Sequence, residues 1–392
     1  MNPSAILSTS AATRYHALDG MRGAMMLLGI YLHVACAYAT IGNWPYKQPD
    51  LTPSLNATIT LIHVFRMPAF YMMAGFFTAL LYARRGFAHA AANRLRRIGL
   101  PFVVGWLILF PLVVGLIAVS KGGLRPLVVG LPPAPWWTRF HPMHLWFLEY
   151  LLVLYVLAAV AVPAVRALPA GWRARFTVMF RGAIEAPGGL LLLAVPSALA
   201  LMPMGWAGLD DPSSFVPQPH IVIAYAIPFA VGWLLYLNAD LLDVLRRRAW
   251  GHAILAAAAA ALYLALLYTL PDRGAAFVVK RAAHALAMWL MIFGVTGLFL
   301  RYLRGHHPAW RYLCDSSYFL YIAHMPVIMA LQLLLAPVAL APLVKVAIVL
   351  VAGTAALLVL YHYTVRPTFI GAALNGRRYP IGRAAIADVV AA

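Results

Sequence analysis

Ten apolar stretches of about 20 residues divide this chain, and they limit it to a protein built from membrane-spanning helices. About 20 apolar residues in a helix cross the hydrocarbon core of a bilayer, which is about 30 Å thick. A soluble domain carries about 25% charged residues, whereas this chain of 392 residues is 10% charged and 64% hydrophobic. We therefore expect an all-α, polytopic transmembrane bundle of about ten helices. The stretches lie near residues 19–40, 57–82, 99–119, 144–166, 190–206, 219–237, 252–271, 282–301, 316–336 and 342–365.

The positive charges predict how these helices are oriented. With the N-terminus inside, the inside segments hold 20 Lys and Arg residues and the outside segments hold 8. This bias follows the positive-inside rule, by which basic residues gather in cytoplasmic loops. An even number of helices then places both termini in the cytoplasm. Topology and contact with anionic lipid account for the net charge of +19, so we expect no nucleic-acid partner.

The chain predicts one membrane domain and no soluble domain. We expect residues 1–13 to form a flexible N-terminus, residues 14–365 the membrane domain, and residues 366–392 a basic cytoplasmic tail. No internal repeat is evident. Because many transporters are built from such repeats, this weakly disfavours transport.

Three ionisable residues lie on one face of the first expected helix. At 100° per residue, Asp19, Arg22 and His33 fall within a sector of about 60° around the helix axis. Ionisable residues are costly inside a bilayer and usually mark a functional site. With the boundary near Leu18, His33 lies about 22 Å into the membrane. We therefore predict a catalytic site at these three residues, although a histidine in a bundle can also serve only to join helices.

The second expected helix carries His63 and Arg66 on one side, about 9 and 13 Å below the outer surface. A short loop joins the first two helices, so His33 is expected to meet both residues in the outer half of the membrane. A buried arginine needs an anionic partner. Glu149, about 8 Å below the same surface, is the expected one. We predict His63, Arg66 and Glu149 as substrate-binding residues.

The remaining histidines include one further candidate. His324 has Ser317 and Tyr321 on its helical face, and we predict it as a substrate-binding residue, with helix packing as the alternative. His141 and His144 are spaced like a pair of zinc ligands, but a zinc site needs further ligands. We therefore expect no bound metal.

An arginine-rich segment precedes the third expected helix at its cytoplasmic end. Arg94, Arg96 and Arg97 lie within four residues. Because guanidinium groups pair bidentately with phosphate, the segment is predicted to bind a nucleotide-like donor, and it also suits a topological anchor. No glycine-rich phosphate loop or serine-nucleophile motif is evident. Because these motifs are not evident, we expect chemistry in which a histidine acts as a base or as a transient acyl acceptor.

These motifs resemble those of the acyltransferase-3 family of integral membrane acyltransferases. The family hallmark is an arginine followed, after ten residues, by a histidine, and Arg22 and His33 match it. Residues 66–68 and 144–148 look most like the branch that contains the succinyltransferase of osmoregulated periplasmic glucans. The segments that resemble the family come in family order and are residues 18–23, 65–77, 94–101, 144–152 and 317–326.

The resemblance implies a membrane O-acyltransferase of the bacterial inner membrane. It implies transfer of an acyl group, succinyl or acetyl, from cytoplasmic acyl-CoA to a hydroxyl of a periplasmic glucan or another envelope carbohydrate. Acyl-CoA would be a co-substrate, no cofactor would be bound, and the partners would be the bilayer and the carbohydrate. The alternative is a transporter or flippase for an anionic or acylated sugar, in which the same polar residues bind the cargo. The oligomeric state is left open.

Within this resemblance, each candidate residue has an expected role. The three arginines of residues 94–97 would bind the CoA phosphates, and Asp19 and Arg22 would organise the entrance to a tunnel. His33 would deprotonate the acceptor hydroxyl or carry the acyl group. Arg66, with His63, would stabilise the oxyanion or pair with a succinyl carboxylate.

Overall fold

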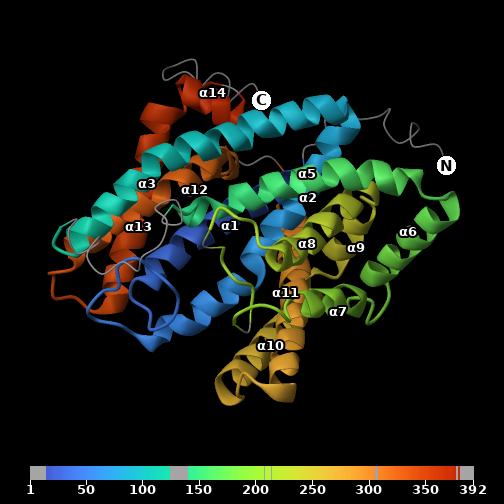
Figure 1. Ribbon diagram of the computed structural model, residues 1–392, viewed down its shortest axis with the longest axis horizontal. Coiled ribbons are helices and arrows are strands. Elements are labelled where there is room, and N and C mark those ends of the chain that lie inside the picture. Colours follow the sequence, from blue (N-terminus) through green and yellow to red (C-terminus); the bar gives the residue numbers. More distant parts are fainter. Residues whose placement is uncertain are drawn as a thin grey trace.

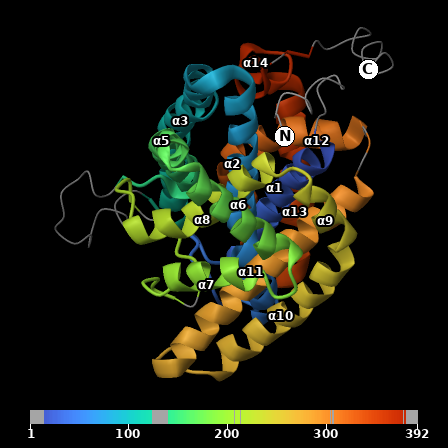
Figure 2. The ribbon, with the colours of Figure 1, turned by 90° about the vertical axis from the view of Figure 1, so that its right-hand side faces the viewer.

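The structure, a computed structural model, is a bundle of helices from which the α10–α11 hairpin projects (Figures 1 and 2). Within the described residues, pairing of extended segments is limited to one isolated bridge between Ala39 and Thr52. The described residues are 15–123, 140–206, 208–212, 214–303, 305, 308–376 and 378–379. The N-terminal segment 1–13 and most of the basic tail lie outside this range, so their predicted character stays a prediction.

Thirteen α-helices are described, of which nine are long and four are short. The long helices are α1 (His16–Cys36), α2 (Asn56–Arg94), α3 (Leu100–Ser120), α5 (Trp146–Ala167), α8 (Pro219–Leu237), α10 (Ala249–Thr269), α11 (Gly274–Tyr302), α12 (Pro308–Leu335) and α13 (Pro342–Leu360). The short helices are α6 (Ala170–Glu185), α7 (Leu191–Ala200), α9 (Leu241–Arg247) and α14 (Phe369–Asn375).

The predicted fold class is confirmed, because each of the ten apolar stretches coincides with a helix. Seven stretches of the described chain are long and apolar enough to cross a membrane, and the first of them, Pro53–Ser120, contains both α2 and α3. The ten-residue α7 is about 15 Å long, too short to cross alone. α1 lies at the centre, packed against α2, α11, α12 and α13. A helix enclosed by protein needs less hydrophobicity than one that faces lipid, so α1 accommodates its ionisable residues.

Two glycines bring α2 and α8 into close contact. A Cβ atom at Gly75 would overlap the carbonyl oxygen of Phe229, and one at Gly232 would overlap that of Met72. Small residues at membrane-helix interfaces allow such close approach of backbones. The crossing therefore holds α2, which carries His63 and Arg66, firmly against α8.

The segment between α1 and α2 folds back over the end of α1. The Lys47 ammonium donates hydrogen bonds to the carbonyl oxygens of Cys36, Ala39 and Ile41, at 2.7, 2.9 and 2.8 Å. Trp44 is 7% exposed, donates to the Gln332 side chain on α12, and lies with its ring 5.3 Å from that of His33. Trp44 therefore closes one side of the region around His33.

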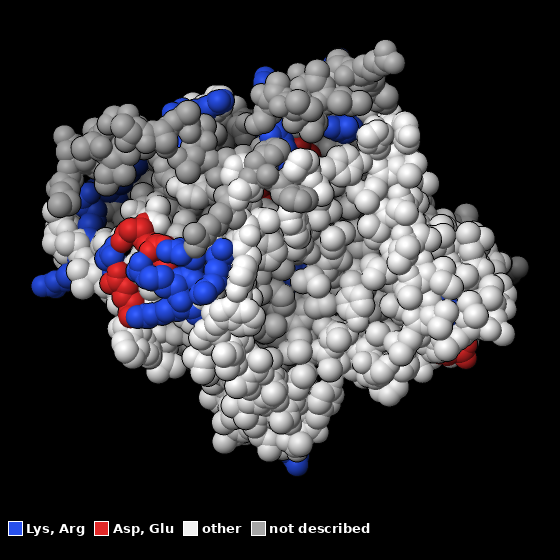
Figure 3. All heavy atoms as spheres, turned by 180° about the vertical axis from the view of Figure 1, so that it is seen from behind, with Lys and Arg blue, Asp and Glu red and all other residues white. Residues whose placement is uncertain are grey.

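The molecular surface separates a charged region from a broad apolar one. Figure 3 shows one dense group of charged side chains on this face and a wide area that carries almost none. Large apolar side chains are exposed along the long helices, such as Val119 at 70%, Val160 at 69% and Val351 at 69%. Arg181 of α6 bridges to Asp240 at 2.8 Å and lowers the pKa of that carboxyl, chiefly through a hydrogen bond. This division is that of an integral, multi-pass membrane protein.

Candidate active site

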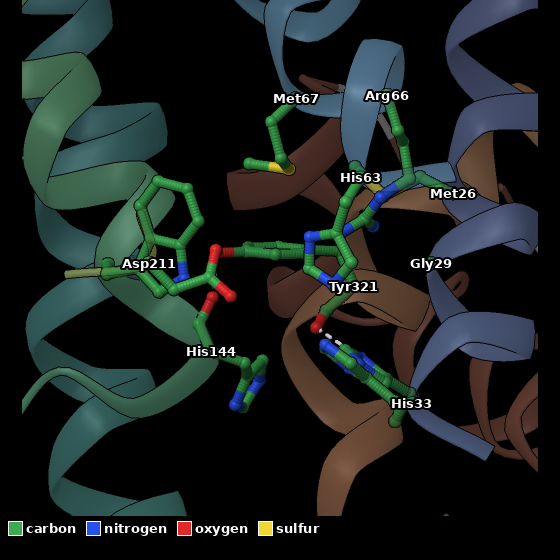
Figure 4. A pocket seen from close by; sticks show the side chains of 11 residues that line it. Met26, Gly29, His33, His63, Arg66, Met67, His144, Asp211 and Tyr321 are labelled. Carbon is green, nitrogen blue, oxygen red and sulfur yellow. Dashed lines mark hydrogen bonds between the residues drawn. The ribbon is translucent and has the colours of Figure 1, made fainter. Parts of the chain in front are cut away.

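A cavity of about 40 Å³ lies among α1, α2, α12 and the start of α5. Figure 4 shows side chains from these elements turned toward one another, with Asp211 facing them from the loop before α8. The volume is enough for a few water molecules. Seven of its eleven lining residues are polar: four histidines, an arginine, a carboxylate and a tyrosine. The lining consists of His33, His63, Arg66, His144, Asp211, Tyr321 and His324, with Met26, Gly29, Met67 and Trp146.

His33 and His324 form a hydrogen-bonded pair of imidazoles. Nδ1 of His33 lies 2.6 Å from Nε2 of His324. The ring centroids are 4.9 Å apart and the planes differ by 12°, so the rings meet edge to edge in nearly one plane. Nδ1 of His324 lies 2.7 Å from the carbonyl oxygen of Tyr321 and 3.1 Å from that of Leu320. A carbonyl oxygen can only accept, so Nδ1 of His324 carries the hydrogen.

His144 is fixed by a carbonyl that a proline leaves free. Pro326 lies inside α12 and has no N–H to donate to the carbonyl oxygen four residues earlier, that of Ile322. His144 Nε2 donates to this oxygen at 2.9 Å. The Tyr321 hydroxyl donates to the His144 carbonyl oxygen at 2.7 Å. These two bonds dock the turn before α5 on α12, and Met143 accommodates the turn with a left-handed φ of 52°.

The hydrogen bonds determine which ring nitrogens are available for chemistry. A second positive charge beside Arg66 would be costly in this enclosed site, so we treat the histidines as neutral. His324 then accepts at Nε2, which makes His33 the donor at Nδ1 and leaves the Nε2 lone pair of His33 unused. Nδ1 of His144 is likewise a bare acceptor, buried and with no partner in the described part of the chain. Two basic nitrogens therefore serve this cavity. Within the described residues, no group of three or more His, Cys, Asp or Glu side chains is arranged to hold a metal ion.

Arg66 occupies the space left by a glycine. A Cβ atom at Gly29 would overlap Nη1 of Arg66. Arg66 is 7% exposed, and its Nε has no hydrogen-bond partner among the described residues. The expected pair with Glu149 is not formed: Glu149 is buried but does not line the cavity, and no ion pair between the two appears in the described chain. The carboxylate that shares the cavity with Arg66 is Asp211.

Asp19 and Arg22 lie away from this cavity. Arg22 approaches the Asp19 carboxylate at 3.6 Å and the Cys314 carbonyl oxygen at 3.5 Å. The shared helical face follows from the continuous helix α1, but Arg22 and His33 are eleven positions apart, about 16 Å along the axis. Any role of Asp19 and Arg22 is therefore at the other end of α1, and they do not touch the group that His33 would act on.

The side chains of the three arginines before α3 lie in different surroundings. The helical run of α2 is interrupted at Gly86, with φ of 76°, and a π-helical turn, Leu95–Gly99, leads into α3. Arg94 turns inward, donating to Thr78 at 3.1 Å and lying 5.3 Å from the Tyr155 ring centroid. Arg97 packs against Gly376 beyond α14. Arg96 is exposed.

Comparison with known proteins shows the family of the chain. The sequence profile of the acyltransferase-3 family, described as an acyltransferase domain, matches residues 15–362. The chain belongs to this family. Its relatives include proteins named Glucans biosynthesis protein C from Salmonella paratyphi B and Salmonella dublin, each 24% identical over 343 residues, covering 82% of this chain and 84% of the relative. The protein of that name from Salmonella typhimurium is 24% identical over 341 residues. No solved structure matches the chain.

The protein is thus a multi-pass membrane acyltransferase, and its cavity contains residues that pattern reasoning missed. Gly29 gives no signal in the sequence, because its importance lies in the guanidinium packed on it. Asp211 did give a sequence signal, because it follows Asp210 and two adjacent aspartates stand out in a chain with 11 acidic residues. His144 was considered as a zinc ligand, whereas in the acyltransferase its Nε2 donates a hydrogen bond to a carbonyl oxygen of α12.

Proposed function

We propose that this acyltransferase moves an acyl group, succinyl or acetyl, from cytoplasmic acyl-CoA to a hydroxyl of a periplasmic glucan or another envelope carbohydrate. The membrane would be the inner membrane of a bacterium. The observation that carries the proposal is the His33 ring, held by His324 with its Nε2 lone pair unused. The name of the relatives, Glucans biosynthesis protein C, supports a glucan as acceptor.

The geometry supports His33 as the general base. His33 Nε2 takes the proton from the acceptor hydroxyl, and the hydroxyl oxygen bonds to the thioester carbon. Negative charge then develops on the carbonyl oxygen, where the Arg66 guanidinium, with His63 beside it, stabilises it. The carbon–sulfur bond breaks, and CoA leaves as the thiol with the proton that His33 carried. Transfer through an acyl group on His33 would use the same nitrogen.

The donor would approach from the arginine-bearing end of the bundle. Arg96 is exposed, and Arg97 lies beside it against the segment after α14, so both suit the phosphates of CoA. Arg94 would support them from within. Met26, Gly29 and His33 lie along one side of α1 and line the cavity. Methionine side chains are flexible, so movement of Met26 and Met67 would widen the cavity for an acyl group.

The test is acyl transfer by the purified, membrane-reconstituted protein with labelled succinyl-CoA or acetyl-CoA and a glucan acceptor. We expect His33→Ala to reduce turnover by about 10²–10⁴-fold, the contribution of a general base. His89→Ala is the matched control, because His89 contacts Arg85 at an exposed site. Full turnover by His33→Ala would contradict the proposal. Mass spectrometry of envelope glycans from a strain that lacks the gene identifies the missing acyl group.

A further inference from the structure

We propose that Asp211 binds the acceptor through hydrogen bonds from the hydroxyls of an uncharged sugar. This inference rests on the proposed function, and it specifies the class of substrate that one side of the cavity binds. The segment between α7 and α8 brings Asp211 to the cavity. In Figure 4, Asp211 lies on one side, and His33, His63 and Arg66 lie on the other.

The Asp211 carboxylate has no direct partner in the described part of the chain, although its charge acts on Arg66 and His63. Asp211 is exposed although it lines the cavity, so it lies at the opening. Neither a hydrogen bond nor an ion pair engages its carboxylate within the described residues. On the far side, Arg66 is 93% buried and its Nε is unpartnered among those residues. A buried polar group without a partner has lost its hydrogen bonds to water and gained none in return, so the cavity favours a ligand that supplies hydrogen bonds to both sides.

The adjacent carboxylate shows what a structural aspartate looks like in this loop. Asp210 accepts a hydrogen bond from the Gly205 backbone N–H at 2.7 Å. Trp206 Nε1 donates to the Leu209 carbonyl oxygen at 3.0 Å. These bonds close the turn locally. Two neighbouring acids therefore differ in use: Asp210 shapes the loop, and Asp211 is left free to bind a ligand.

A buried arginine holds the start of this loop in place. Arg281 is fully buried and donates to the carbonyl oxygens of Leu201, Met204 and Trp206, each at 2.9 Å. A buried cation is stable only when it is well hydrogen-bonded, and these carbonyls satisfy it. The loop is therefore set before the ligand arrives, which reduces the entropy that binding costs.

The chemistry of the opening favours an uncharged polyol. An ionised carboxylate only accepts hydrogen bonds, and neighbouring hydroxyls of a sugar donate to its two oxygens. An anionic acceptor, such as a phosphate-bearing glycan or lipid headgroup, would be repelled by the same carboxylate. The sugar would then lie between Asp211 and His33, with the reacting hydroxyl toward His33 Nε2.

The experiment compares Asp211→Asn and Asp211→Ala with the parent protein on an uncharged glucan. We expect KM for the glucan to rise about 10- to 100-fold, as for loss of hydrogen bonds to a charged group. KM for acyl-CoA should change much less, and the slow hydrolysis of acyl-CoA without acceptor reports on the chemistry separately. Asp50→Asn is the matched control: it removes a carboxylate from the segment before α2, where Asp50 lies 3.9 Å from Lys345. A third variant, Asp211→Lys, should improve the use of a phosphate-bearing glucan relative to the uncharged one.

The outcomes separate this inference from the proposed function. Parent protein that transfers no acyl group contradicts the proposed function itself. Active parent protein with an unchanged glucan KM in Asp211→Ala overturns the role of Asp211. A parallel loss of acyl-CoA hydrolysis in Asp211→Asn also overturns it, because the residue would then serve the chemistry or the fold. Size-exclusion chromatography of both variants checks that they remain folded.

Discussion

The histidines of the cavity and the arginines before α3 assemble in opposite ways. His33, His144 and His324 are far apart in the sequence, yet the rings of His33 and His144 both contact the ring of His324. Arg94 and Arg96 are two residues apart, yet one turns into the bundle and the other lies exposed. Proximity in sequence thus places residues at one end of a membrane protein, whereas packing decides which of them share a site.

The difference has an energetic basis. Exposed arginines remain hydrated, so no specific arrangement is required of them. Their electrostatic contribution to stability and binding is small and is screened by salt. Buried polar groups need partners in defined geometry. The cavity supplies these from backbone carbonyls, including the Ile322 oxygen that Pro326 leaves free. Variants of the cavity residues and variants of the arginines before α3 should therefore change different kinetic parameters.

The largest effect is expected at Arg66. Arg66→Met keeps much of the side-chain volume and removes the charge, so kcat should fall about 10²–10³-fold, the effect of losing an oxyanion donor. Gly29→Ala should act in the same direction, because a Cβ there displaces the guanidinium. Labelled-acyl transfer at saturating donor measures both. A near-normal kcat in Arg66→Met would remove Arg66 from the chemistry.

A smaller effect is expected at His324, which positions His33. His324→Met removes the acceptor for the His33 Nδ1 hydrogen, and kcat should fall about 100-fold while KM for acyl-CoA stays similar. His324→Gln should recover part of the loss, because its amide oxygen accepts from His33 and its amide nitrogen donates to the Tyr321 carbonyl. Equal activity of the two variants would mean that His324 serves only to pack helices.

The smallest effect is expected at the arginines. Arg96→Ala should raise KM for acyl-CoA about 3- to 10-fold at low salt, and the difference should fade at high salt as screening weakens exposed charges. Arg94→Ala should mainly lower the thermal unfolding midpoint, because it loses contacts to Thr78 and Tyr155. The reverse pattern would place the donor phosphates at Arg94.

Much of the fold and part of the cavity were predictable from the sequence. The apolar stretches mark the helices because crossing a bilayer imposes a local requirement on length and composition. The sequence analysis expected His33, His63 and Arg66 to meet and named His324 as a separate candidate, and all four line the cavity, since ionisable residues stand out in apolar stretches. Glu149 was not placed correctly, because depth in the membrane gives no information on which neighbour a side chain faces.

The amino-acid sequence by itself determined the class of fold and which apolar stretches carry ionisable side chains, since hydrophobicity acts residue by residue. Tertiary structure alone decided that His33 bonds to His324, that Asp211 faces Arg66 across a cavity, and that Asp19 and Arg22 lie elsewhere. Those outcomes depend on how α1, α2 and α12 cross and on a loop held by Arg281. Contacts between distant segments arise from the packing of the whole bundle, and no local stretch of the chain encodes them.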